Sequence, residues 1–245
     1  ALHHGAAVRA LRGAGGRVRE VVYARDGVEH RLAPASVVSS LPLHRLVEMT
    51  EPVAPAEVRA AAAGLRWRGI RLLQVQLAAA RCLDGETYYF PEERYCFGRI
   101  SEPPLFSPHM RDDAARTALN IEVICSPGDA LWELDEAAFL ARVMRDIAAI
   151  DLFRPADLLA ARSLRLPAVY PVYDLAYRAR LARVLDWVAS FDNLYSIGRG
   201  GMFLHANTDH SIHLGLRLGE HLARPGARAA TWRRDLPDEE FRVRD

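Results

Sequence analysis

Residues 197–212 read IGRGGMFLHANTDHSI, and this segment contains the residues with the clearest chemical potential in the chain. Three glycines flank Arg199. Glycine lets a backbone approach a phosphate closely, and an arginine offers a fork of donors to phosphate oxygens. The segment therefore predicts a phosphate-binding turn, with a surface turn and a solvated arginine as the alternative.

Asp209 lies where a helix over 211–222 is expected to begin, and a carboxylate at that place is a common N-cap. Three histidines lie nearby, at His205, His210 and His213. Together with Asp209 they invite the hypothesis of a metal site, but their spacing fits no zinc pattern, and no metal is predicted.

The basic residues are all arginine, because the 32 basic residues include no lysine. No residue can therefore form a Schiff base or act as a lysine general base. Abundant alanine and arginine indicate a bacterial source with GC-rich DNA. The formal net charge of +1 gives no reason to expect nucleic acid or an anionic membrane as a partner.

No apolar run approaches the roughly 18 residues that a membrane span needs. Three scattered cysteines, Cys82, Cys96 and Cys125, indicate reduced thiols and a cytoplasmic location rather than a disulfide framework or a zinc site.

The first forty residues predict a three-stranded antiparallel meander. Its β-leaning segments are 7–12, 17–24 and 28–32. Asp26-Gly27 between two alternating segments is a strong hairpin signal. GAGG at 13–16 is interpreted as a second hairpin turn, because a dinucleotide-binding glycine loop leads into a helix and this one leads into a strand. A short buried strand over 36–41 follows and stops at Pro42.

The remainder predicts an α+β (α/β) fold, in which an antiparallel sheet with helices accompanies part of a strand-and-helix layer. Helices are expected at 42–49, 55–63, 135–150, 174–190 and 211–222. Strands are expected at 69–78, 86–91, 95–101, 116–125, 160–167 and 193–197. From residue 224 the chain predicts a loose tail or a short terminal helix.

Several segments, taken in order, resemble a known superfamily. NLYSIGRGGMFLHANTDHSIHLGLRLGEHL (193–222) resembles the C-terminal flavin-binding segment of the amine oxidase, protoporphyrinogen oxidase and phytoene desaturase superfamily, in the GR-x-G-x-aromatic form of UDP-galactopyranose mutases. Residues 8–43 resemble its middle segment. CFGRISEPPLFSP (96–108) is similar to the strand that faces the flavin in mutase-like members, and AVYPVYD (168–174) to a substrate-side turn. The resemblance covers nearly the whole chain.

The resemblance implies an FAD site and a set of cofactor-binding residues, namely Val8, Gly198, Arg199, Asp209, Ser211 and Ile212. The backbone of Val8 would hold adenine. The backbone at Ser211 and Ile212 would lie near the flavin pyrimidine edge, where a helix dipole stabilises the negative charge of a reduced flavin. The superfamily's N-terminal strand–GxGxxG–helix unit is not found in the sequence, so we expect that this chain alone does not hold FAD.

Arg99 and Tyr170 are the substrate-side candidates for catalysis, again by resemblance. An arginine on a strand can instead belong to a solvated sheet face. Tyr170 and Tyr173 flank Pro171, and both can be aromatic core at a turn. His205 stands where the mutases carry a tyrosine, and this departure speaks against a mutase substrate.

The expected organisation has four parts: a remnant of an FAD-binding domain (1–48), a substrate-binding antiparallel sheet with helices (49–173), a returning FAD-binding segment (174–223) and a tail (224–245). Residues 1–41 and 193–222 are expected to pair with each other. The sheet edge left open is expected to be covered by self-association into a homo-oligomer.

Three functions remain open. The chain is expected to be the C-terminal fragment of an FAD-dependent oxidoreductase that takes hydride from a small organic substrate. The absence of lysine disfavours an ordinary amine oxidase. The alternatives are a non-redox flavoenzyme resembling UDP-galactopyranose mutase, which Arg99 favours, and a catalytically inactive fragment or interaction module.

Overall fold

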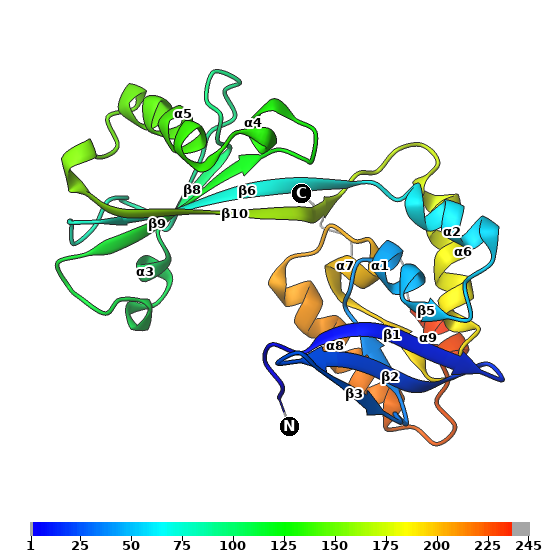
Figure 1. The fold of residues 1–245 in the computed structure, drawn as a ribbon. Coiled ribbons are helices and arrows are strands. Elements are labelled where there is room, and N and C mark those ends of the chain that lie inside the picture. Colours follow the sequence, from blue (N-terminus) through cyan, green and yellow to red (C-terminus); the bar gives the residue numbers. More distant parts are fainter. Residues whose placement is uncertain (1, 237–245) are drawn as a thin grey trace. The chain divides into compact units, whose positions relative to one another are not determined.

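The computed structural model describes residues 2–236, which form two compact units (Figure 1). The first unit contains residues 2–66 and 170–236, and the second contains residues 67–169. The unit boundaries thus fall at 67 and 169, whereas the sequence interpretation divides the chain at 49 and 173. No helix in the described part of the chain is long and apolar enough to cross a bilayer.

The first unit begins with the predicted meander. Strands β1 (Ala7–Ala14), β2 (Arg17–Arg25) and β3 (Val28–Leu32) pair antiparallel, and β5 (Thr50–Glu51) adds to β1 in parallel. Gly15 and Gly16 have φ of 57° and 69°, and Asp26 and Gly27 have φ of 51° and 78°. Positive φ at both central residues is the geometry of type I′ hairpin turns, so both predicted hairpins are confirmed.

The other elements of the first unit are β4 (Val37–Ser39), α1 (Leu43–Glu48), α2 (Ala56–Ala63), α6 (Tyr177–Ala189), β11 (Leu194–Ser196), α7 (Gly198–Met202), α8 (Thr208–Leu222) and α9 (Ala229–Asp235). Strands β4 and β11 pair in parallel, with Leu194 opposite Val37 and Ser196 opposite Ser39. The expected pairing of the first and last segments is thereby confirmed. Of the predicted C-terminal tail, residues 229–235 form the short helix α9, which buries Trp232 near Tyr195, and residues 237–245 lie outside the described residues.

Asn193, just before β11, connects three segments that lie far apart in the sequence. Its Oδ1 accepts from the Val18 amide at 2.8 Å, and its Nδ2 donates to the carbonyls of Val18 at 3.0 Å and Ala35 at 3.2 Å. The side chain is buried, so no water can replace these bonds if the side chain is removed.

We expect Asn193→Ala to lower the free energy of unfolding by about 2–3 kcal/mol, because it leaves buried backbone groups of Val18 without partners. Asn207→Ala is the matched control. Asn207 is exposed at the N-cap of α8 and its side chain makes no capping hydrogen bond, so its loss should cost less than about 0.5 kcal/mol. Urea denaturation measures both variants, and equal effects would contradict this account of Asn193.

The second unit is a five-stranded sheet in the order β10-β6-β9-β8-β7. Its strands are β6 (Trp67–Leu77), β7 (Thr87–Tyr89), β8 (Arg99–Ser101), β9 (Thr117–Ile124) and β10 (Leu158–Pro171). Its helices are α3 (Pro103–Phe106), η1 (Pro108–Met110), α4 (Ala130–Glu133), α5 (Glu136–Ala149) and η2 (Pro155–Asp157).

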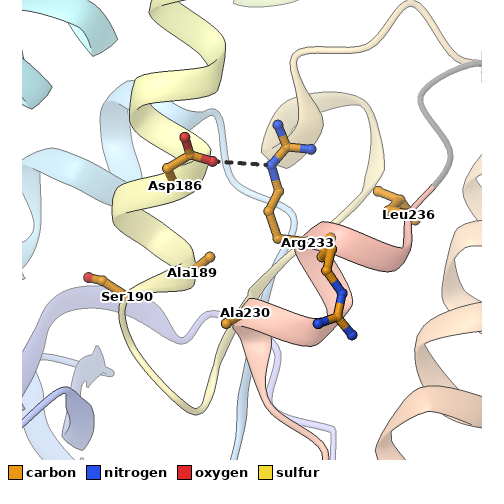
Figure 2. Close-up of a pocket in the computed structure, with 7 residues that line it drawn as sticks. Asp186, Ala189, Ser190, Ala230, Arg233 and Leu236 are labelled. Carbon is orange, nitrogen blue, oxygen red and sulfur yellow. Dashed lines mark ion pairs between the residues drawn. The ribbon is translucent and has the colours of Figure 1, made fainter.

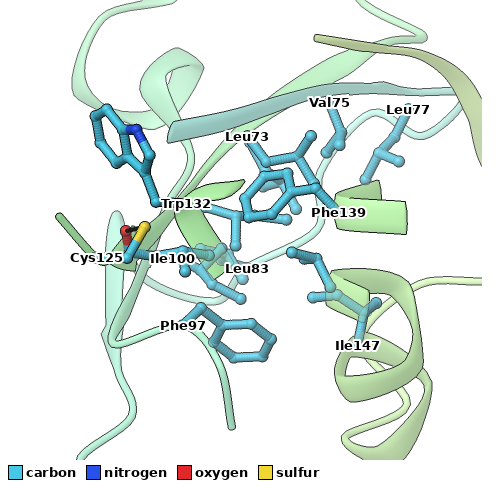
Figure 3. Close-up of a cluster of buried hydrophobic side chains, with 14 residues drawn as sticks. Leu73, Val75, Leu77, Leu83, Phe97, Ile100, Cys125, Trp132, Phe139 and Ile147 are labelled. Atoms are coloured by element: carbon cyan, nitrogen blue, oxygen red, sulfur yellow. Dashed lines mark hydrogen bonds between the residues drawn. The ribbon is translucent and has the colours of Figure 1, made fainter. Parts of the chain in front are cut away.

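Helices α4 and α5 cover one face of this sheet. Asp135 is the N-cap of α5, because its side chain accepts a hydrogen bond from the Ala138 amide at 2.8 Å. Alternate residues of β6 and β9 then meet Phe139, Val143 and Ile147 of α5 in a buried cluster (Figure 3). The period of two in the strands and the helical spacing in α5 are what the sequence predicts for this core.

The opposite face of the sheet carries polar side chains that are joined across the strands. Gln74 on β6 donates to Asn120 on β9 at 3.1 Å and accepts from Arg162 on β10 at 3.2 Å. Arg99 on β8 forms an ion pair with Glu122 on β9. This polar face is the part of the second unit that can recognise a hydrogen-bonding molecule.

The cysteines of the second unit are free thiols held in their protonated form. Burial and the nearby Glu102 carboxylate raise the pKa of Cys82 from its ordinary 9.0 to about 11. Burial, followed by the hydrogen bond with Asp146, raises the pKa of Cys96 to about 12.

Because the thiolate is the reactive form, we expect Cys82 to react with a disulfide reagent at pH 8 about a hundredfold more slowly than an unperturbed thiol. Cys96 should react more slowly still. The rate should rise about tenfold per pH unit up to pH 10, and thiol titration in native buffer measures it. Fast, pH-independent labelling of either residue would contradict this prediction.

Candidate functional site

The glycine-rich segment forms a strand, a turn and a short helix. Strand β11 ends at Ser196, and α7 begins at Gly198 with φ of +72°. Helix α7 ends at Met202, and the following C-cap residue, Phe203, is a non-glycine residue at φ +49°. The sequence interpretation treats this segment as a turn, and α7 is missed because three glycines in five residues oppose a helix on propensity alone.

Gly200 and Gly201 allow α7 to pack directly on the end of β4. A Cβ at Gly200 would lie 2.5 Å from the Ser40 carbonyl oxygen. A Cβ at Gly201 would lie 2.6 Å from Ser196 Oγ and 2.9 Å from the Ser39 carbonyl oxygen. The close approach that these two glycines permit is therefore to the chain's own backbone.

Arg199 and Tyr170, predicted separately, lie together. The Arg199 guanidinium donates from Nε to the Ala206 carbonyl at 3.1 Å and from Nη2 to the same oxygen. Its Cζ lies 5.0 Å from the centre of the Tyr170 ring. Arg199 thus holds the segment between α7 and α8 through the Ala206 carbonyl, and its guanidinium stacks on Tyr170 at the end of β10.

Tyr173 holds the same segment from another side. Its hydroxyl accepts from the His205 amide at 2.7 Å and donates to the Phe203 carbonyl at 3.3 Å. The His205 ring stands edge-on to Tyr170, with 5.4 Å between ring centres. Phe203 and Tyr177 complete this aromatic cluster and were missed, because the sequence pattern does not show which aromatic side chains meet in space.

Helix α8 begins at Thr208, earlier than the expected 211. Asn207 occupies the N-cap position, and no side chain caps the first turn. The N-cap interpretation of Asp209 is therefore wrong. Asp209 lies in the first turn, and its Oδ1 is 3.3 Å from His210 Nδ1. A carboxylate in the first turn still interacts favourably with the helix dipole.

Beyond its first turn, α8 presents an open face. Ser211 Oγ donates back to the Asn207 carbonyl at 3.2 Å, and Ile212 is 59% exposed. A Cβ at Gly215 or Gly219 would have no atom within 4 Å. The face of α8 that begins at Ser211 is therefore unobstructed within the described residues.

The remaining predicted residues belong to other elements of the chain. Val8 is 39% exposed on β1, paired with Tyr23. Arg99 lies on β8 of the second unit in its ion pair with Glu122. Among residues 2–236, no three His, Cys, Asp or Glu side chains are close enough to hold a metal ion.

A hollow of about 630 Å³ lies between the end of α6 and α9 (Figure 2). Asp186 and Arg233 pair across it at 3.6 Å, and Arg234 pairs with the adjacent Asp235 at 2.8 Å. Because its charged groups neutralise one another, we do not assign the site to this hollow.

These elements define an α+β fold, in which one unit carries a parallel strand pair leading through the glycine-rich turn to α8, and the other is an antiparallel sheet with helices. No protein-family model and no curated protein matches the sequence. Solved structures do share the fold. Reduced UDP-galactopyranose mutase aligns with a TM-score of 0.73 and 18% identity over 90% of this chain and 46% of the mutase chain.

Two further structures match similarly. An oxidoreductase from Methanosarcina mazei aligns with a TM-score of 0.57 and 15% identity, over 88% of this chain and 49% of its own. Putrescine oxidase with putrescine bound aligns with a TM-score of 0.59 and 14% identity, over 89% of this chain and 49% of its own. The fold implied by the resemblance is thereby confirmed, and the chain spans about half the length of the structures it matches.

Proposed function

We propose that the chain is the C-terminal part of an FAD-dependent oxidoreductase, with one wall of the flavin site formed by its first unit. The observation that carries this proposal is the β11–α7–α8 arrangement. Strand β11 leads through Gly198 into α7 and then into α8. The N-cap residue of α8, Asn207, makes no side-chain capping hydrogen bond. An uncapped N-terminus offers backbone amides to an anion or an electron-rich ring edge.

The residues of α8 fit a flat, partly apolar cofactor. Ile212 is exposed, and the space beside Gly215 and Gly219 is open. FAD, when bound, supplies the acceptor for a substrate hydride. The N-terminus of α8 would stabilise the negative charge that a reduced flavin carries. Arg199 and Tyr173 would keep the 203–207 segment in place through their contacts with Ala206, Phe203 and His205.

The second unit is proposed to bind a small organic substrate with its polar sheet face, on which Arg99 lies. Non-redox chemistry of the mutase type is the second candidate. Two observations favour it: the mutase has a TM-score of 0.73, against 0.57 for the oxidoreductase and 0.59 for putrescine oxidase, and Arg99 lies on the polar sheet face. Self-association and a cytoplasmic location stay predictions.

The test uses the protein as its whole gene encodes it. We expect the purified protein to show the visible absorption bands of oxidised flavin. Ile212→Arg should lower the flavin content at least about tenfold, because a bulky charge then stands on the open face of α8. Val28→Arg is the control, since Val28 is similarly exposed, at 58%, on β3. A flavin-free protein, or full flavin content in Ile212→Arg, would overturn the proposal.

Reduction of the bound flavin under anaerobic conditions distinguishes the redox from the non-redox function. An oxidoreductase should have its flavin bleached by its substrate, whereas a mutase-type enzyme should turn over only after its flavin has been reduced chemically. A protein that binds flavin and does neither with any tested substrate would favour the inactive-module alternative.

A further inference from the structure

We propose that a hollow on the polar face of the second unit binds the phosphate group of a small phosphorylated molecule. The hollow has a volume of about 370 Å³. Its floor includes Gln76 on β6 and Ala118 on β9, which are directly paired across the two strands. Its wall includes residues of the η1 turn and the segment after it. A volume of this order is typical of small-molecule sites.

The hollow gathers hydrogen-bond donors that the fold does not use. Arg111 lines it, and the buried Arg111 Nε has no hydrogen-bond partner among residues 2–236. Gln76 contrasts with its neighbour on the same face, because Gln74 bridges Asn120 and Arg162 while the Gln76 amide makes no hydrogen bond within the described residues. A buried donor without a partner, such as Arg111 Nε, is costly, and a ligand acceptor would satisfy it.

Arg111 forms no ion pair within residues 2–236, so its guanidinium can face an anion in the hollow. Arg116 also lines the hollow, and its Nε is 3.3 Å from Asp113 Oδ2. Asp112 is the carboxylate in the lining, and His109 adds an imidazole whose ring nitrogens can hydrogen-bond to a ligand. One guanidinium group satisfies the two oxygens of a planar carboxylate. A tetrahedral phosphate has further oxygens, which can accept from a second guanidinium group and from an amide donor.

The site is held by rigid local structure. The amide of Met110 donates to the Ser107 carbonyl at 3.0 Å, and that of Arg111 donates to the Pro108 carbonyl at 3.3 Å. Beside the floor, the buried Thr117 donates its hydroxyl to Glu102 at 2.6 Å. The donors are therefore presented by a turn and a sheet whose positions are set without the ligand, and the proposal does not depend on flavin binding elsewhere.

The experiment titrates the protein with inorganic phosphate and with glycerol 3-phosphate, following backbone amide resonances by NMR at constant ionic strength. We expect saturable shifts confined to residues near 76 and 108–118. Arg111→Gln should weaken binding of both probes about tenfold or more, because it removes a charge-assisted contact. Asp112→Asn should tighten binding several-fold by removing the opposing charge.

Arg94→Gln is the control for net charge. Arg94 is an exposed arginine of the same unit that stacks on Tyr95 at 4.7 Å, outside the hollow. It should leave the affinity unchanged. The proposal is overturned if the probes produce no saturable shifts, if Arg111→Gln and Arg94→Gln weaken binding equally, or if acetate binds as tightly as phosphate.

Discussion

Arg71→Ala is expected to lower the free energy of unfolding of the second unit by about 3–5 kcal/mol, because it removes a fully buried side chain together with its hydrogen bonds and its packing on Phe139. Arg71 has no exposed surface. Its guanidinium donates to the Leu134 carbonyl at 2.6 Å, to Glu136 at 2.9 Å and to Ser163 at 3.2 Å. It also lies 3.8 Å from the centre of the Phe139 ring.

These contacts explain why an arginine occupies a core position of β6. The Arg71 guanidinium donates to carbonyls at the end of α4 and in the connection to α5, while its flat face packs on Phe139. Arg165 shares two of these carbonyls, donating to Trp132 at 3.2 Å and to Leu134 at 2.8 Å. Arg71→Lys should recover only part of the loss, because an ammonium group cannot reproduce the fork. The fork is thus a structural cross-link between the sheet and its helical layer.

Arg68→Ala is the matched control on the same strand. Arg68 is half exposed and pairs with Asp129 at 3.3 Å, so its removal should cost at most about 1 kcal/mol. Hydrogen exchange of core amides in β6 and β9 measures the second unit separately from the first. If Arg71→Ala and Arg68→Ala have similar effects, the assignment of a structural role to the buried guanidinium is wrong.

Gly201→Ala and Gly200→Ala are each expected to destabilise the first unit by about 2–3 kcal/mol or more. The added methyl group would lie 2.5 Å from the Ser40 carbonyl oxygen for Gly200. For Gly201 it would lie 2.9 Å from the Ser39 carbonyl oxygen and 2.6 Å from Ser196 Oγ. Helix α7 would have to separate from β4. In the flavin proposal this also displaces the turn at Gly198 and lowers flavin affinity.

Gly219→Ala provides the opposite expectation within the same unit. Gly219 lies inside α8 with no atom within 4 Å of an added Cβ, so alanine should stabilise the protein by up to about 1 kcal/mol through helix propensity alone. Thermal unfolding followed by circular dichroism compares the variants. A neutral Gly200→Ala together with a destabilising Gly219→Ala would contradict the packing described for α7.

The sequence predicted most of the elements, because their signals are local. Alternation and the Asp26-Gly27 pair specify the meander, and apolar spacing specifies α5 and α6. Helix α7 was missed because its stability comes from packing against β4 rather than from propensity. The start of α8 was placed late because Asp209 resembles an N-cap in sequence, whereas Asn207 occupies that position in space.

The candidate site was predicted in part. The sequence identified Arg199 and Tyr170, and the structure shows the guanidinium stacked on that ring. It did not identify Phe203, Tyr177 or the hydroxyl bridge of Tyr173, because these contacts join residues about thirty positions apart. Nor did it identify Arg111 and Gln76. Their role as candidate ligand donors depends on the structure, in which Arg111 Nε and the Gln76 amide make no hydrogen bond with the other described residues.

By itself the sequence determined the strand and helix content, the resemblance that implies the fold, and the absence of lysine chemistry, since these depend on residue type and near-neighbour spacing. Only the tertiary structure decided what the glycines and arginines do. The same glycine can face a ligand or its own backbone, and the same arginine can face solvent or a buried carbonyl. The long-range packing of β4 against α7, and of β6 against α5, decides between these roles.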